Sequence, residues 1–192
     1  MKRNLLNCIA SKLPGSSLLI VFLCSFLVNV SAQPGFNFQS PTRISGVDLA
    51  VNTNYRFSNI TTGTDAIVTI TGTTGGAYLT ALDDGAFGYA KALQPIVHVP
   101  ANSNGYVELR IDFVNTGTST ASSMTEVPIT LLDIDAATFG GENIYEYDDV
   151  QALSGYSLEY NTNTELNVTV ASNWARGLNV PASEYLGIDT LQ

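Results

Sequence analysis

Acidic side chains are concentrated in residues 131–150 of this sequence. Six carboxylates lie in this segment, at Asp133, Asp135, Glu142, Glu146, Asp148 and Asp149. In an extended strand, Asp133 and Asp135 would face the same side about 7 Å apart, so a bend at the strand end lets both reach one ion. Calcium takes about six to eight oxygen ligands from carboxylates, carbonyls and water. We therefore predict a calcium site with Asp133, Asp135 and Glu142 as ligands.

Two other interpretations of this acidic segment stay open. It lacks the spacing of an EF-hand loop, because residue Ala137 stands where a third ligand would fall. A solvated acidic loop on an acidic protein explains the composition without any ion. Paired carboxylates also perform general acid and base chemistry in glycoside hydrolysis. A second acidic stretch, Asp83-Asp84-Gly85, is predicted to be a plain turn.

Residues for nucleophilic or zinc chemistry are scarce. The single histidine, His98, lies in a short apolar run typical of a strand. A Ser-His-Asp triad would have to use it, and no Gly-x-Ser-x-Gly elbow frames a serine. A zinc site needs more His or Cys than the chain offers. We therefore expect no catalytic residues and a protein that is not an enzyme.

Aromatic side chains indicate a different kind of site. The last third of the chain contains Tyr145, Tyr147, Tyr156, Tyr160 and Trp174. Flat rings stack on the apolar faces of sugar rings, so this group raises carbohydrate binding as an alternative function. The interpretation that we favour from the sequence is that alternate tyrosines such as Tyr145 and Tyr147 are half-buried strand residues that pack against their neighbours.

Strands must position these side chains. The clearest is Val107–Phe113, where apolar and charged residues alternate as in a half-buried antiparallel strand, and Asn115-Thr116-Gly117 ends it as a turn. No stretch has the apolar stripe of a helix. We predict an all-β protein, an antiparallel β-sandwich of immunoglobulin-like or jelly-roll-like type, with a barrel as the alternative. Further strands are predicted at residues 55–60, 65–71, 95–99, 127–134, 156–160 and 166–171.

The start of the chain has the three parts of a secretory signal peptide. Lys2 and Arg3 supply positive charge, residues 18–28 are apolar, and small residues lead to Ala32. We predict cleavage between Ala32 and Gln33. The apolar run is shorter than the roughly 20 residues of a transmembrane helix, so we expect a secreted or cell-surface protein with no membrane span after cleavage.

The charge and the cysteine content of the mature chain differ from those of the full sequence, because the signal peptide is removed. Three of the eight Lys and Arg residues precede the cleavage site and all 17 Asp and Glu residues follow it, which leaves five cations and a net charge of −12. Such a surface disfavours nucleic acid, whose phosphates need clustered Lys and Arg. Both cysteines, Cys8 and Cys24, lie in the signal peptide, so no disulfide is expected. The predicted divisions are a signal peptide at 1–32, an extended leader at 33–45, a β-sandwich domain at 46–172 and a C-terminal extension or linker at 173–192.

Three stretches carry a resemblance to a known family: residues 105–118, the run Leu132-Asp133-Ile134-Asp135, and residues 142–147. They resemble the N-terminal module of large exported proteins of the Bacteroidetes, particularly flavobacteria, which often carry a sorting domain for type IX secretion. Some of those proteins are similar to gliding-associated adhesins. The module usually reads Asp-Ile-Asp-Gly, and Ala136 replaces the glycine here. The resemblance covers about residues 46–171 and implies a cell-surface β-domain without a defined activity.

Three functional hypotheses follow. The first is a non-enzymatic extracellular β-sandwich module with an adhesion or structural role, stabilised by calcium. The second is a carbohydrate-binding module, and the third is a glycan hydrolase that uses paired carboxylates. The expected partners are surface glycans or other surface proteins.

Overall fold

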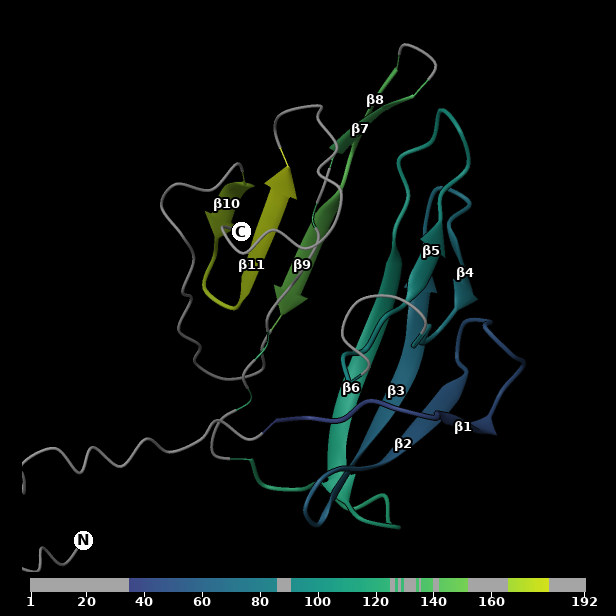
Figure 1. Ribbon diagram of the computed structural model, residues 1–192, viewed down its shortest axis with the longest axis vertical. Coiled ribbons are helices and arrows are strands. Elements are labelled where there is room, and N and C mark those ends of the chain that lie inside the picture. Colours follow the sequence, from purple (N-terminus) through teal and green to yellow (C-terminus); the bar gives the residue numbers. More distant parts are fainter. Residues whose placement is uncertain are drawn as a thin grey trace, which may run out of the picture. The chain divides into compact units, whose positions relative to one another are not determined.

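The computed structural model describes residues 35–85, 91–124, 127, 129, 134, 136–139, 142–151 and 166–179. Within these residues the protein is all-β, with antiparallel sheets and no helix (Figure 1). This confirms the predicted fold class, an antiparallel all-β architecture of the kind that builds β-sandwiches. In the same residues, no helix is long and apolar enough to cross a membrane.

Four sheets contain the described strands. A four-stranded sheet has the order β1-β2-β3-β6, a three-stranded sheet has the order β10-β11-β9, and two hairpin pairs are β4-β5 and β7-β8. The strands are β1 Thr42–Ser45, β2 Asn54–Thr61, β3 Thr64–Thr73, β4 Tyr78–Ala81, β5 Ile96–His98, β6 Val107–Asn115, β7 Ala136–Phe139, β8 Glu142–Tyr145, β9 Tyr147–Gln151, β10 Leu166–Val170 and β11 Trp174–Asn179.

The hydrophobic core lies on one face of the four-stranded sheet. Strands β2 and β3 correspond to the predicted strands at 55–60 and 65–71 and form a hairpin. Its turn contains Gly63 at a φ of 75°, a backbone angle that glycine adopts without steric cost. Strand β6 pairs with β3 along its whole length. Because side chains alternate between the faces of a sheet, every second residue in the regular parts of β2, β3 and β6 points towards the core. The buried members of this core are Phe38, Tyr55, Phe57, Ile60, Ala66, Val68, Ile70, Leu79 and Leu82.

The segment before β2 belongs to the fold, which differs from the extended leader predicted at residues 33–45. Phe36 stacks on Phe113 with ring centroids 5.6 Å apart, and Phe38 packs edge-on against Phe57 at 5.3 Å. Strand β1 then pairs with β2 at the edge of the sheet. Two phenylalanines separated by one residue anchor this segment, although their short run shows no strand periodicity in the sequence.

The end of the described chain also differs from the prediction. Residues 173–192 were expected as an extension or linker, but β11 is the central strand of the three-stranded sheet, between β10 and β9 (Figure 1). The predicted strand at 166–171 is confirmed as β10, and its described partner is β11. The predicted strand at 156–160 lies outside the described residues. Gly177 and the charged Arg176 interrupt the apolar pattern of β11, which is why the sequence does not show it as a strand.

Candidate ligand-binding face

The predicted calcium site falls mostly on residues that the structure does not describe. Asp133 and Asp135 lie outside the described residues, as do Ala32, Gln33, Tyr156 and Tyr160. Glu142 opens β8 and pairs with Phe139 of β7. In the part of the chain that is described, no three His, Cys, Asp or Glu side chains are grouped as a metal ion would require. The calcium site therefore stays a prediction from the sequence.

The remaining acidic residues of that segment separate in the structure. Asp148 and Asp149 are adjacent in β9, so their side chains leave the strand on opposite faces. Asp149 is paired with Arg176 of β11, which the sequence analysis did not single out. Asp148 and Asp149 therefore lie on opposite faces of the three-stranded sheet, so their charges are not gathered at one point.

One face of this sheet gathers aromatic and charged residues. In the antiparallel register, Asp149 lies opposite Arg176 and Tyr147 lies opposite Leu178. Residues directly opposite each other share a face, and so do residues two positions apart in a strand. Trp174 is two positions before Arg176 and therefore joins the same face. We call the group Tyr147, Asp149, Trp174 and Arg176 the aromatic–arginine face.

Arg176 is the centre of the aromatic–arginine face. Its Nε and Nη2 atoms donate hydrogen bonds to the two carboxylate oxygens of Asp149, each at 2.6 Å. This two-pronged pairing fixes the plane of the guanidinium group. The guanidinium carbon lies 4.4 Å from the ring centroid of Tyr147 and 5.8 Å from that of Trp174, within the range of cation–π attraction. The two rings and the ion pair are thus held in one fixed arrangement.

The electrostatics of the face follow from this pairing. The hydrogen bond to Asp149 is the main reason that the pKa of Arg176 lies above its usual value, so the guanidinium is charged at every pH of interest. Burial is the main cause that raises the pKa of Tyr147, although the nearby Arg176 charge lowers it. The phenol therefore stays neutral and keeps its proton for donation. The positive charge of Arg176 and the negative charge of Asp149 cancel within the face.

Neutral polar residues continue this face onto β10. Thr169 lies opposite Arg176 and Asn167 lies opposite Leu178, and both side chains are exposed. The other face of the sheet is different, because the buried Ile134 packs against it: a Cβ atom at Gly177 would lie 3.1 Å from Ile134 Cδ1. The aromatic–arginine face thus combines partly exposed rings with donors and acceptors, a combination suited to ligands that have both apolar and hydroxyl-bearing surfaces.

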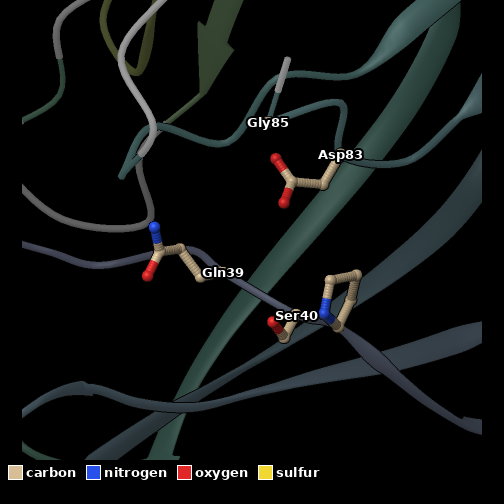
Figure 2. Close-up of a pocket in the computed structure, with 5 residues that line it drawn as sticks. Gln39, Ser40, Asp83 and Gly85 are labelled. Carbon is tan, nitrogen blue, oxygen red and sulfur yellow. The ribbon is translucent and has the colours of Figure 1, made fainter.

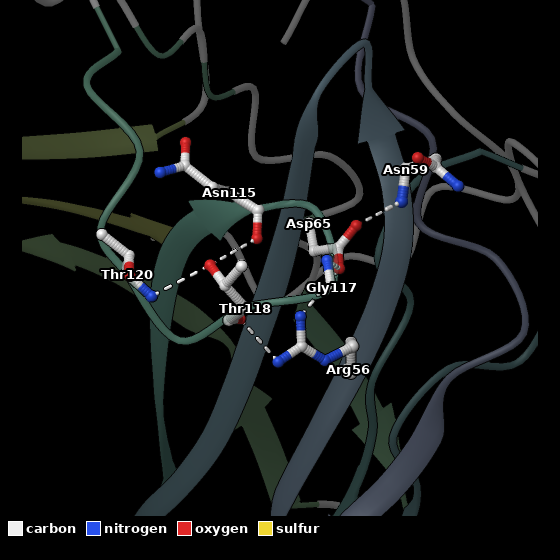
Figure 3. Close-up of polar contacts among 7 residues, drawn as sticks. All are labelled: Arg56, Asn59, Asp65, Asn115, Gly117, Thr118 and Thr120. Atoms are coloured by element: carbon white, nitrogen blue, oxygen red, sulfur yellow. Dashed lines mark hydrogen bonds and ion pairs between the residues drawn. The ribbon is translucent and has the colours of Figure 1, made fainter.

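A second Arg–Asp pair is buried in the four-stranded sheet, and no pattern in the sequence predicts it (Figure 3). Asp65 of β3 accepts hydrogen bonds from Arg56 Nη1 at 2.7 Å, from the Asn59 amide at 2.8 Å and from the Gly117 amide at 2.9 Å. Burial alone would raise the pKa of Asp65, but these hydrogen bonds outweigh it and lower the pKa to about 2. Arg56 Nη2 also donates to the Thr118 carbonyl at 2.7 Å.

The buried Arg56–Asp65 pair holds two backbone segments in place and does not line an open site. Asn59 and Gly117 both have positive φ angles, and the amide of each points at Asp65 (Figure 3). The bulge in β2 and the turn after β6 are therefore tied to the same carboxylate. The predicted turn at Asn115-Thr116-Gly117 is confirmed by a hydrogen bond from the Thr118 amide to the Asn115 carbonyl at 2.9 Å.

A shallow hollow of about 420 Å³ is lined by Gln39, Ser40, Pro41, Asp83 and Gly85 (Figure 2). Asp83 directs its carboxylate into this space and accepts a hydrogen bond from the Gln94 amide at 3.2 Å. Burial and the neighbouring Asp84 raise its pKa, while the Gln94 amide lowers it. The hollow brings no second acidic lining residue to Asp83 among those that the structure describes, and it offers no aromatic surface.

The protein was compared with protein-family models, with curated proteins and with solved structures. No family model, curated protein or solved structure matches the chain. The function is therefore inferred from the contacts, burial and charges of the residues themselves.

Proposed function

We propose that this protein is a non-enzymatic, exported β-sandwich module that acts in adhesion by binding surface glycans through the aromatic–arginine face. The observation that supports this proposal is the position of Arg176, paired with Asp149 and held against the rings of Tyr147 and Trp174. Sugar rings have apolar faces formed by C–H groups and edges formed by hydroxyls. Rings that are fixed before binding lose little conformational entropy when such a ligand stacks on them.

The hydrogen-bonding groups of the face fit the same ligand class. Asp149 accepts and Arg176 donates, and the exposed Thr169 and Asn167 do both. Hydroxyl groups of a sugar are likewise donors and acceptors, so each can pair with this edge of the sheet. The three-stranded sheet spreads these groups over a surface rather than a deep pocket, which favours an extended polysaccharide over a small molecule.

Hydrolysis is less well supported than binding. Retaining glycosidases need two carboxyl groups about 5 Å apart, and inverting ones place them about 6 to 10 Å apart. Within the described part of the aromatic–arginine face, Asp149 is the one carboxylate, and its oxygens both accept from Arg176. A carboxylate held in this way is stabilised as an anion and is a poor proton donor. We therefore propose a binding role without turnover.

Titration of the purified exported protein with soluble polysaccharides tests the proposal. We expect Trp174→Ala to weaken binding by about tenfold, the usual value of one stacking contact. Tyr78→Ala is the matched control, because Tyr78 is an exposed aromatic residue on β4, where its ring packs beside His98. Equal affinities for the two variants, or no binding to any polysaccharide, would contradict the proposal. Release of reducing sugar from any bound polysaccharide would contradict its non-enzymatic part.

A further inference from the structure

We infer that the aromatic–arginine face selects neutral glycans over glycans that carry carboxylate or sulfate groups. This inference rests on the proposed function, because it names the class of glycan that the same face would bind. It is carried by one feature: the arginine in the centre of the face already has an anion. Asp149 occupies two donors of Arg176, and both side chains are comparably exposed, at 42% and 39%.

An anionic glycan would have to compete with Asp149 for the guanidinium group. Asp149 is in the adjacent strand and needs no association step to reach Arg176, so its effective concentration is high. A ligand carboxylate that displaced it would leave Asp149 without its cation and beside a second negative charge. Both effects disfavour acidic sugars at this position, whereas a neutral sugar leaves the ion pair intact and uses the remaining hydrogen-bonding capacity.

The other cations of the protein do not supply a second anion site on this face. After residue 32 the chain has five Lys and Arg residues. Arg56 is paired with the buried Asp65, and Arg110 is paired with Asp112 on β6. Arg43 lies on β1 of the four-stranded sheet, and Lys91 precedes β5. The 17 acidic residues outnumber these cations, so the long-range field also repels a polyanion.

The groups around the ion pair match a neutral ligand. Thr169 and Asn167 are uncharged and exposed on β10, and Gln151 of β9 lies opposite Trp174 and is exposed. Hydroxyl and amide side chains both donate and accept hydrogen bonds, as sugar hydroxyls do. None of these three side chains favours a charged ligand over an uncharged one.

Matched pairs of polysaccharides test this inference on the unaltered protein. The pairs are hydroxyethylcellulose with carboxymethylcellulose, dextran with dextran sulfate, and methyl-esterified with de-esterified homogalacturonan, because the members of each pair share a backbone and differ in charge. We expect at least one neutral member to bind about tenfold more tightly than its charged partner in 150 mM salt. Equal or tighter binding of the charged member would overturn the inference while leaving the proposed function standing. If no member of any pair binds, the proposed function itself fails.

A variant removes the expected preference. Asp149→Asn removes the anion and releases Arg176, so we expect about a tenfold gain in affinity for dextran sulfate. Asp112→Asn is the control, because it removes the same charge and releases Arg110 from an exposed ion pair on β6, which belongs to the four-stranded sheet. An equal gain in both variants would mean that overall charge, not Asp149, decides the selectivity, and would overturn the inference. The matched pairs above remain decisive if Asp149→Asn does not fold.

Discussion

Two Arg–Asp pairs of this protein have nearly the same bond lengths and opposite surroundings. The pair Arg56–Asp65 is joined at 2.7 Å, and Asp65 is 1% exposed. The pair Arg176–Asp149 is joined at 2.6 Å, but both side chains are about two-fifths exposed. The carboxylate of Asp65 also accepts hydrogen bonds from two backbone amides. The Arg176–Asp149 pair instead has aromatic rings and solvent around it. Burial, rather than the pairing itself, therefore distinguishes an ion pair that stabilises the fold from one that is accessible to a ligand.

The largest expected effect is on the buried pair. Asp65→Ala leaves Arg56 without its anion and the amides of Asn59 and Gly117 without their acceptor. Breaking a buried pair from one side costs about 3 to 5 kcal/mol. We expect a loss of unfolding free energy in this range, measured by urea denaturation. A loss below about 1 kcal/mol would show that the two pairs do not differ in the way proposed.

Acid sensitivity gives the next largest effect. The pKa of Asp65 is about 2 in the folded protein and 3.8 in its ordinary environment. Because the pKa of Asp65 is lower in the folded state, its ionised carboxylate stabilises the fold above the pKa of the unfolded state. This contribution is lost as the pH falls through the pKa of the folded state. We therefore expect about 2 kcal/mol of stability to disappear between about pH 4 and pH 2. Denaturant midpoints measured across this window should fall steeply for the native protein and less steeply for Asp65→Asn.

Removing the exposed pair should hardly change stability. Arg176→Leu breaks an ion pair that is screened by water and salt, and such pairs contribute less than about 1 kcal/mol. We expect a change of this size in urea denaturation, with a much larger change in glycan affinity. If Arg176→Leu destabilised the protein as strongly as Asp65→Ala, the exposed pair would also be structural. The assignment of a binding role to its face would then lose its basis.

The sequence predicts the fold better than it predicts these two pairs. Strand Val107–Phe113 alternates so regularly that its inward side is evident, and the hairpin of β2 and β3 follows from a turn at Gly63. The first pair depends on Gly117, which is 52 residues from Asp65. No local pattern links two such distant positions, and a carboxylate in a strand ordinarily indicates a solvent-facing side.

The aromatic–arginine face was only partly predictable. The sequence indicates Trp174 and Tyr147 as aromatic candidates for sugar binding but not Arg176, because residues 173–192 show the pattern of an extension. A signal was present in the spacing: Tyr147 and Asp149, like Trp174 and Arg176, are two residues apart and therefore share a face if both segments are strands. The sequence does not show that these two segments are neighbouring strands. That information comes from the register of β9 with β11, which places Asp149 opposite Arg176.

Trp174 is the single tryptophan of the chain, so its fluorescence reports directly on the aromatic–arginine face. The most direct test of the account is to follow this emission while a neutral polysaccharide is added to the purified protein. We predict a saturable change in the emission of Trp174 that matches the affinity from calorimetry and persists in 1 M salt, because a neutral ligand releases no counterions. Glycan binding by calorimetry with no change in Trp174 emission, or no saturable change with any neutral polysaccharide, would contradict the assignment of this face.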